Sequence, residues 1–228
     1  RFINSNLKVA SENTDASAAS TFAVDVAGFF QSEEIAYNDF NGRWRAGINF
    51  QNMGPKINYD NDDNDLNSNF LPANMRIGTG FDFIFDDYNK IGVNLEVTKL
   101  LVPTPQSADL DGDGLVTSPE EIALRDENNA AYNKVNWVSG IFKSFGDAPG
   151  GFSEELQEFT YSVGAEYVYQ DSFAMRLGYF NESPEKGARK FFSLGAGFKY
   201  NVVKVDVSYL GIVYKEIDIL YLIDGIPR

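Results

Sequence analysis

The residues most suited to chemistry in this sequence are acidic side chains with the spacing of a calcium-binding loop. Asp109, Asp111 and Asp113 alternate with other residues, Gly114 follows, and Glu120 closes the pattern. Calcium prefers roughly six to eight oxygen ligands, which such a loop supplies while its glycine permits a sharp turn. The expected ligands are Asp109, Asp111, Asp113, the carbonyl oxygen of Leu115, Thr117 directly or through water, and Glu120 with both carboxylate oxygens.

The segments on either side of this loop limit what a bound calcium ion could do. Residues 120–129 have the composition of an exiting helix, whereas residues 102–108 contain two prolines and offer no entering helix. We therefore expect a structural Ca²⁺ that stiffens its surroundings rather than a calcium sensor. An acidic turn without a bound ion is the alternative interpretation.

The composition of the chain excludes several classes of function. It contains neither cysteine nor histidine, which removes thiol chemistry, histidine-dependent hydrolysis and histidine-ligated zinc. Its net charge is −14, and its 19 basic residues are scattered rather than clustered. Nucleic acid is therefore not an expected partner, because phosphate binding needs clustered Lys and Arg.

Two further features could be mistaken for catalytic or phosphate sites. Adjacent carboxylates such as Glu33 with Glu34, or Glu154 with Glu155, are interpreted as solvated loop residues, since acid–base catalysis needs carboxyls in contrasting environments. The glycines of 144–155 lack the Lys-Ser/Thr pair and the helix start of a phosphate-binding loop. This segment is expected to be a glycine-bent loop, of the kind that carries binding function.

Strict alternation of apolar and polar residues is the strongest structural signal. In 43–52, Trp44, Ile48 and Phe50 oppose Arg43, Arg45 and Gln51, because strand side chains alternate between two faces. One face suits lipid and the other water, which predicts the wall of an outer-membrane β-barrel. The predicted strands are 2–10, 21–31, 43–52, 75–85, 91–101, 158–169, 173–180, 191–200 and 202–210.

Connection lengths add an independent indication of this fold class. The connections at 86–90, at 170–172 and near Asn201 are short, whereas 54–73, 102–157 and 181–190 are long. Bacterial barrels pair short periplasmic turns with long extracellular loops. We therefore predict an all-β, antiparallel transmembrane barrel as one partial domain over 1–228. Its extracellular insertion is 102–157, with a short helix in this largest loop.

Charged residues at polar-face positions of the strands allow two interpretations. They can neutralise one another inside the wall, since unpaired charges there would be costly. Alternatively, they can line a solute channel. The residues are Arg43, Arg45, Arg76, Arg176, Lys199 and Lys204, with Asp82, Glu96, Glu166 and Asp206.

Several long segments carry a resemblance to a known family. They include N-M-G-P at 52–55, F-L-P-A-N at 70–74 and K-L-L-V-P-T-P at 99–105, and the likeness continues through 145–155 and 179–192. The chain resembles the PorV family, outer-membrane shuttle proteins of the type IX secretion system. That family is similar in architecture to the fatty-acid channel FadL, with fourteen strands. The resemblance thus implies a C-terminal portion supplying about nine strands, although the tail 211–228 departs from the family pattern.

The resemblance implies a non-enzymatic role at the cell surface. Family members take secreted cargo from the translocon barrel by its C-terminal signal domain and deliver it to a PorU-like sortase and attachment complex. The expected location is the bacterial outer membrane, integral and in contact with its lipid, with the long loops facing the exterior. The candidate cargo-contact loops are 60–72, 144–155 and 181–190.

Other functions are weighed against this one. A FadL-like channel for hydrophobic solutes across the outer membrane is the main alternative, favoured by the shared architecture. A lipopolysaccharide deacylase is less favoured because the sequence has no histidine to activate a nucleophile. A soluble all-β domain is the least favoured, because the apolar faces carry bands that water would not tolerate.

Overall fold

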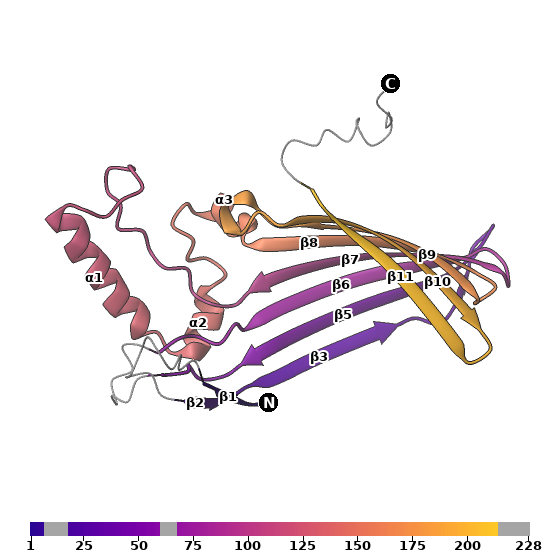
Figure 1. Ribbon diagram of the computed structural model, residues 1–228, viewed down its shortest axis with the longest axis horizontal. Helices are drawn as coiled ribbons and strands as arrows, with labels where there is room; N and C mark the ends of the chain where they lie inside the picture. The colour runs from indigo at the N-terminus through magenta and orange to yellow at the C-terminus, as the bar shows by residue number, and fades with distance from the viewer. Residues whose placement is uncertain (7–17, 60–67, 214–228) are drawn as a thin grey trace, which may run out of the picture. The chain divides into compact units, whose positions relative to one another are not determined.

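The computed structural model describes residues 1–6, 18–59 and 68–213, and their main element is a nine-stranded sheet (Figure 1). Its strands follow chain order along the sheet, β3-β5-β6-β7-β8-β9-β10-β11, with β4 pairing β5. The strands are β3 (Val24–Gln31), β4 (Ile35–Ala36), β5 (Asn41–Met53), β6 (Asn74–Ile84), β7 (Asn89–Leu100), β8 (Phe159–Tyr169), β9 (Phe173–Asn181), β10 (Lys190–Tyr200) and β11 (Val203–Ile212).

The predicted strands from residue 43 onward are confirmed to within about two residues at each end, as are the positions of the short and long connections. Along the part of the chain that the structure describes, the sheet order runs from β3 to β11 without a pairing between them. The observed fold is thus a large sheet, and closure into a barrel is not seen in it. Residues 214–228, the end of the predicted atypical tail, lie outside the described residues.

The N-terminal strands differ from the prediction. The single strand predicted over 21–31 is interrupted at Ala23, whose main-chain N–H donates to the carbonyl oxygen of Arg1 over 2.9 Å. β2 (Ala19–Phe22) instead pairs antiparallel with β1 (Phe2–Ser5) in a separate two-stranded sheet. The remainder of the strand predicted over 2–10, from residue 7, lies outside the described residues.

The chain divides into two compact units. One comprises 1–28, 48–76 and 98–158, and holds β1, β2 and all three α-helices. The other comprises 29–47, 77–97 and 159–228, and holds β8 to β11. No described helix is long and apolar enough to cross a membrane.

The register of β8 to β10 separates a polar from an apolar face. Glu166 lies opposite Arg176 on the polar face, and Ala165 lies opposite Leu177 on the other, where Leu177 in turn faces Leu194. Rows containing aromatic side chains occupy both ends of the apolar face, as in the girdles of outer-membrane barrels. These rows are Val163, Tyr179 and Phe192 at the long-loop end, and Tyr169, Phe173 and Phe198 at the short-turn end.

An aromatic cluster lies over Gly42 in the second unit. The centroid of the Phe81 ring lies 4.6 Å from that of Trp44 and 6.1 Å from that of Tyr37, in edge-to-face arrangements. Tyr37 also stacks on Phe40, with 5.0 Å between ring centroids. A Cβ atom at Gly42 would collide with the Phe81 and Tyr37 rings, so this packing depends on a residue without a side chain.

We predict that Gly42→Ala destabilises the protein by about 1–3 kcal/mol, because an added methyl group forces both rings to move. Gly28→Ala is the matched control, since a Cβ there meets only Ile48 at an ordinary 3.6 Å. Urea unfolding in lipid vesicles, followed by tryptophan fluorescence, measures both variants. Equal midpoints for the two would contradict this account of Gly42.

Candidate functional site

Three helices form the insertion that the sequence placed at 102–157. α1 (Pro119–Asn133) confirms the predicted exiting helix, and its N-cap Ser118 forms a capping box with Glu121. α2 (Trp137–Lys143) is capped by Asn136, whose side chain accepts from the Val138 N–H. α3 (Phe152–Gln157) begins within the stretch predicted to be only a glycine-bent loop.

The C-terminal end of α1 is held by a lysine from the connection after β5. Lys56 Nζ donates to the carbonyl oxygen of Asn133 over 2.9 Å and lies 4.2 Å from the centroid of the Phe70 ring. Phe70 packs edge-on against Tyr132, with 5.3 Å between centroids. Since the last turn of α1 has no basic residue, Lys56 supplies the positive charge that a helix C-terminus favours.

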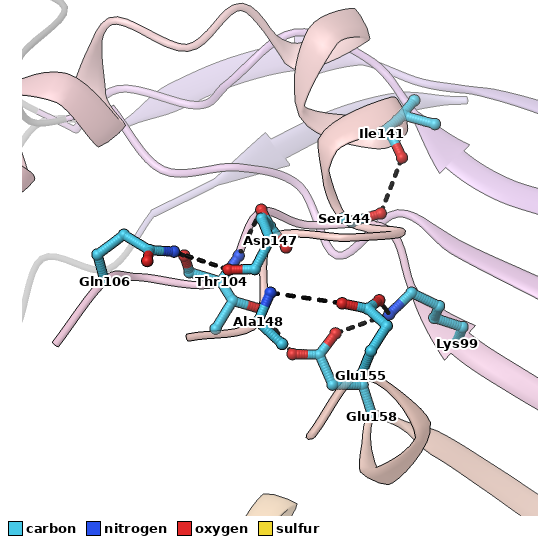
Figure 2. Close-up of polar contacts among 9 residues, drawn as sticks. All are labelled: Lys99, Thr104, Gln106, Ile141, Ser144, Asp147, Ala148, Glu155 and Glu158. Carbon is cyan, nitrogen blue, oxygen red and sulfur yellow. Dashed lines mark hydrogen bonds and ion pairs between the residues drawn. The ribbon is translucent and has the colours of Figure 1, made fainter. Parts of the chain in front are cut away.

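A fully buried lysine ties α3 to the end of β7 (Figure 2). Lys99 Nζ lies 2.6 Å from Glu155 Oε1 and 2.7 Å from Glu158 Oε2, and the side chain of Lys99 is 0% exposed. The ammonium group also lies 5.9 Å from the centroid of the Phe145 ring. A lone buried charge is strongly unfavourable, so these two carboxylates are what allow Lys99 to be buried.

A second layer of hydrogen bonds extends from these carboxylates to two loops (Figure 2). Glu158 Oε1 accepts from the Thr104 hydroxyl over 2.6 Å, and the Thr104 main-chain N–H donates to Asp147 Oδ2 over 3.1 Å. Gln106 Nε2 donates to the main-chain oxygen of Asp147 over 2.7 Å, and the Ala148 N–H donates to Glu155 Oε2 over 3.4 Å. Residues 99–106 and 144–158 therefore form one tied structure, which we call the Lys99 cluster.

The surroundings of Asp147 in the Lys99 cluster disfavour the charged form of its carboxyl group. Burial raises the pKa of its carboxyl group, and the negative charges of Glu158 and Glu155 raise it further, while the hydrogen bond from Thr104 N–H lowers it. Its Oδ1 atom is buried and accepts no hydrogen bond from the described residues. Protonation of Asp147 is thus easier than for an ordinary aspartate.

The interpretation of the Glu154–Glu155 pair as solvated is wrong. Glu155 is buried against Lys99, and Glu154 Oε2 accepts from the Gly150 N–H over 2.6 Å. The sequence did carry one signal of this site, because Lys99 stands at an apolar-face position of β7, in phase with Leu95 and Val97. A charge at such a position indicates a buried partner elsewhere in the chain.

The acidic loop before α1 brings some, but not all, of the predicted calcium ligands together. Carboxylate oxygens of Asp109, Asp111 and Glu121 lie within 4.8 Å of one another. Gly114 has the left-handed φ of +83° that the motif requires of its glycine. Asp109 accepts from the N–H groups of Gly112 and Gly114, over 2.7 and 2.9 Å.

The predicted ligands Asp113 and Glu120 are not members of this three-carboxylate group. Asp113 Oδ1 accepts from the Leu115 N–H over 2.8 Å, and the Thr117 N–H donates to Glu121 over 3.1 Å. Glu120 is exposed in the first turn of α1 and is not in the three-carboxylate group. Glu121, which sequence reasoning missed, also accepts from the N–H groups of Leu110 and Ser118, and these hydrogen bonds lower its pKa to about 2.

Of the other two candidate contact loops, the structure describes 181–190 in full and 60–72 only from residue 68. In 181–190, Arg189 forms a two-point ion pair with Glu182, with both N–O distances 2.7 Å, which lowers the pKa of Glu182. Gly187 takes a φ of +145° beside that carboxylate, where a Cβ atom would collide with it. Of 60–72, residues 60–67 lie outside the described residues, and Leu71 is buried in a small apolar core.

Ion pairs occupy the polar face of the strands in the second unit. Arg45 lies 2.5 Å from Asp82, and the missing side chains of Gly80 and Gly92 leave room for its guanidinium group. Arg176 pairs with Glu166 and, over 2.7 Å, with Asp206. A cavity of about 530 Å³ on this face is lined mainly by charged residues. The expected mutual neutralisation of these charges is therefore observed for both arginines.

We predict that Lys99→Met destabilises the segment 144–158 by about 3–5 kcal/mol, because it leaves two buried carboxylates without a cation. Hydrogen exchange of the α3 amides measures this loss. Lys90→Met is the matched control, since the Lys90–Asp171 pair is exposed and such pairs contribute less than about 1 kcal/mol. A triple variant that also carries Glu155→Gln and Glu158→Gln should recover most of the protection. Native exchange in Lys99→Met would show that the cluster does not hold α3.

Comparison with known proteins finds a family model that matches part of the chain. No curated protein matches the chain. The family model described as "Type IX secretion system protein PorV" matches residues 1–107, which include the segment through β7 and the first half of the Lys99 cluster. PorV proteins are outer-membrane components of that secretion system. Residues 1–107, just under half of the chain, are therefore similar to the PorV family.

Proposed function

We propose that the protein is a non-enzymatic outer-membrane shuttle of the type IX secretion system. In this role it binds the C-terminal signal domains of secreted cargo released by the translocon and carries them to a PorU-like sortase and attachment complex. The observation that carries the proposal is the family match over 1–107. It is supported by a sheet with one apolar and one ion-paired face, as a barrel wall in lipid requires.

We further propose that the strands belong to a FadL-like barrel completed by strands outside this sequence. The antiparallel order then places alternate connections at the same end, so that 54–73, 101–158 and 182–189 share the exterior. The cargo-contact loops are 60–72, 144–155 and 181–190, of which 144–155 is fixed in place by the Lys99 cluster. A fixed loop binds with a smaller loss of conformational entropy than a mobile one.

The alternative function, a FadL-like channel for hydrophobic solutes, has weaker support. A channel for such solutes needs an apolar path through the lumen. The polar-face cavity of the second unit is instead lined by Arg43, Arg45, Asp82, Lys90 and Asp171 among other residues. A charged lining of this kind favours water over an apolar solute.

Affinity purification of the full-length protein from detergent-solubilised outer membranes, with mass spectrometry of its partners, tests the shuttle. We expect the translocon, the sortase and proteins with C-terminal signal domains to co-purify. Deletion of 149–151, the exposed turn of the 144–155 loop, should reduce cargo recovery by about tenfold, corresponding to roughly 1.4 kcal/mol of binding free energy. Deletion of 201–202 in a short turn is the control. Recovery of lipid without protein partners would favour the solute channel.

We also propose a structural calcium ion in the 109–120 loop. Asp109 and Asp111 already converge, and the Asp113 N–H donates to Asp111 Oδ1 over 3.2 Å. The Asp113 carboxylate, the Leu115 carbonyl, Thr117 and Glu120 would complete the set that the motif supplies. Glu121, with its pKa of about 2, is ionised at any working pH and adds negative charge at the same place. The ion would bridge the loop to the N-terminal end of α1 and stiffen it.

Isothermal titration calorimetry with calcium tests this site. We expect a dissociation constant on the order of 10⁻⁴ to 10⁻³ M, the range of extracellular modules, and its loss in Asp111→Asn with Asp113→Asn. Asp126→Asn, on the exposed surface of α1, is the matched control and should bind normally. Absence of binding heat in the parent protein at millimolar calcium would leave the loop as an acidic turn.

A further inference from the structure

Asp147 adds a third carboxylate to the hydrogen-bonded group of Lys99 (Figure 2). The Lys99 ammonium lies 2.6 Å from Glu155 and 2.7 Å from Glu158, so these two carboxylates already exceed its charge. Asp147 is linked to the same group, because Thr104 donates its N–H to Asp147 and its hydroxyl to Glu158. The three linked carboxylates and one ammonium carry an excess of two negative charges when all of them are ionised.

One carboxylate oxygen of Asp147 lacks a donor. This atom, Oδ1, is buried and accepts no hydrogen bond from the described residues, whereas Oδ2 accepts from the Thr104 N–H over 3.1 Å. A buried carboxylate oxygen without a donor favours the protonated, neutral acid. Because Oδ1 is buried, a proton can occupy it, whereas the side chain of a partner or a hydrated cation cannot reach it.

The charged and titratable groups around Asp147 come from three elements of the same unit. Glu155 of α3 and Glu158, the residue after α3, repel its negative charge. Lys99, at the end of β7, is paired with both of these glutamates. Tyr132, in the last turn of α1, stays neutral, because burial and the charge of Asp147 raise the pKa of its hydroxyl group. Removal of the Asp147 charge therefore relieves repulsion and leaves no cation unpaired.

Asp147 also lies where the loop 144–155 is tied to the segment after β7. Gln106 Nε2 donates to the main-chain oxygen of Asp147 over 2.7 Å. The N–H of the next residue, Ala148, donates to Glu155 over a longer 3.4 Å. Repulsion between Asp147 and Glu155 opposes this connection, so the charge on Asp147 affects how firmly the loop is held.

We propose that Asp147 is a pH-responsive element that controls how firmly the loop 144–155 is held on the Lys99 cluster. At mildly acidic pH its side chain takes up a proton, one of the two excess charges is removed, and the loop is held more firmly. At higher pH the ionised side chain repels Glu155 and Glu158, and the loop opens more often. The consequence for cargo rests on the proposed shuttle function, in which a firmer loop binds with a smaller loss of conformational entropy.

The direction of the pH dependence follows from the pKa of Asp147. Burial raises this pKa in the folded loop, and the negative charges of Glu158 and Glu155 raise it further. An acid with a raised folded-state pKa contributes stability that is full below its ordinary pKa of 3.8 and is lost as the pH rises through the folded-state value. The loop is therefore expected to be more stable at about pH 5 than at about pH 7.5.

Hydrogen exchange of the full-length protein in lipid nanodiscs tests this element. Protection factors of the α3 amides, which remove the intrinsic pH dependence of exchange, are compared at about pH 7.5 and about pH 5, where ordinary carboxylates stay largely ionised. We expect protection to rise at least about twofold at the lower pH, with a limit of about tenfold per pH unit for one proton. Unchanged or lower protection at the lower pH would overturn the proposal.

Two variants assign the response to a residue. Asp147→Asn keeps an oxygen for the Thr104 N–H and imitates the neutral acid, so we expect high protection of α3 at both pH values. Glu154→Gln is the matched control, because it removes a carboxylate of the same loop, one that accepts from the Gly150 N–H, and it should keep the pH response. A response that persists in Asp147→Asn would contradict the assignment. The pH profile of the parent protein decides the question should Asp147→Asn fail to fold.

Cargo recovery in the affinity purification, repeated at both pH values, tests the consequence for the shuttle. We expect higher recovery at about pH 5 in the parent protein and equal recovery in Asp147→Asn. The exchange measurement uses no cargo, so its failure is distinguishable from failure of the shuttle. A normal exchange response with equal cargo recovery at both pH values would overturn the link between Asp147 and cargo binding.

Discussion

The positions of residues 99–106 and 144–158 depend on one buried ammonium group. An ion in a low-dielectric interior costs several kcal/mol unless opposite charges and hydrogen bonds surround it. Lys99 is neutralised only when Glu155 and Glu158 are both in place, which requires α3 to dock on the end of β7. The carboxylates in turn bind Thr104 and Ala148, so the paths of two loops follow from one charge. A loop that would otherwise be a glycine-rich connection thereby acquires a defined position.

On the polar face of the sheet, the charges of Arg45 and Arg176 are likewise neutralised by carboxylates of neighbouring strands. Arg45 lies between Gly80 and Gly92, and Arg176 lies beside Gly195 and Gly197. Because glycine has no side chain, a guanidinium group can lie flat against the sheet and reach carboxylates on neighbouring strands. The alternation of glycine with charged residues in these strands is therefore a packing requirement. It keeps the charges paired on one face while the opposite face stays apolar.

Local patterns predicted most of the sheet, and long-range contacts account for the differences. The strands from 43 onward follow from a period of two, which each segment displays by itself. The break at Ala23 depends on Arg1, and the burial of Glu155 depends on Lys99, 56 residues earlier in the chain. Neither partner can be read from a neighbouring residue. The start of α1 was predicted in part. The calcium-loop motif selects Glu120 as a ligand, whereas in the structure the neighbouring Glu121 forms the capping box with Ser118 and joins the carboxylate group.

The two ends of α1 are held unequally, and this bears on what the acidic loop does. Lys56 and Phe70 fix the C-terminal end through a hydrogen bond, a cation–π contact and the ring of Tyr132. At the N-terminal end, the carboxylates of 109–121 bond mainly to main-chain N–H groups of their own loop. Those bonds shape the loop but add no contact to the rest of the unit. A divalent cation is the kind of ligand that would draw these carboxylates into one rigid group and define the N-terminal end as firmly as Lys56 defines the other.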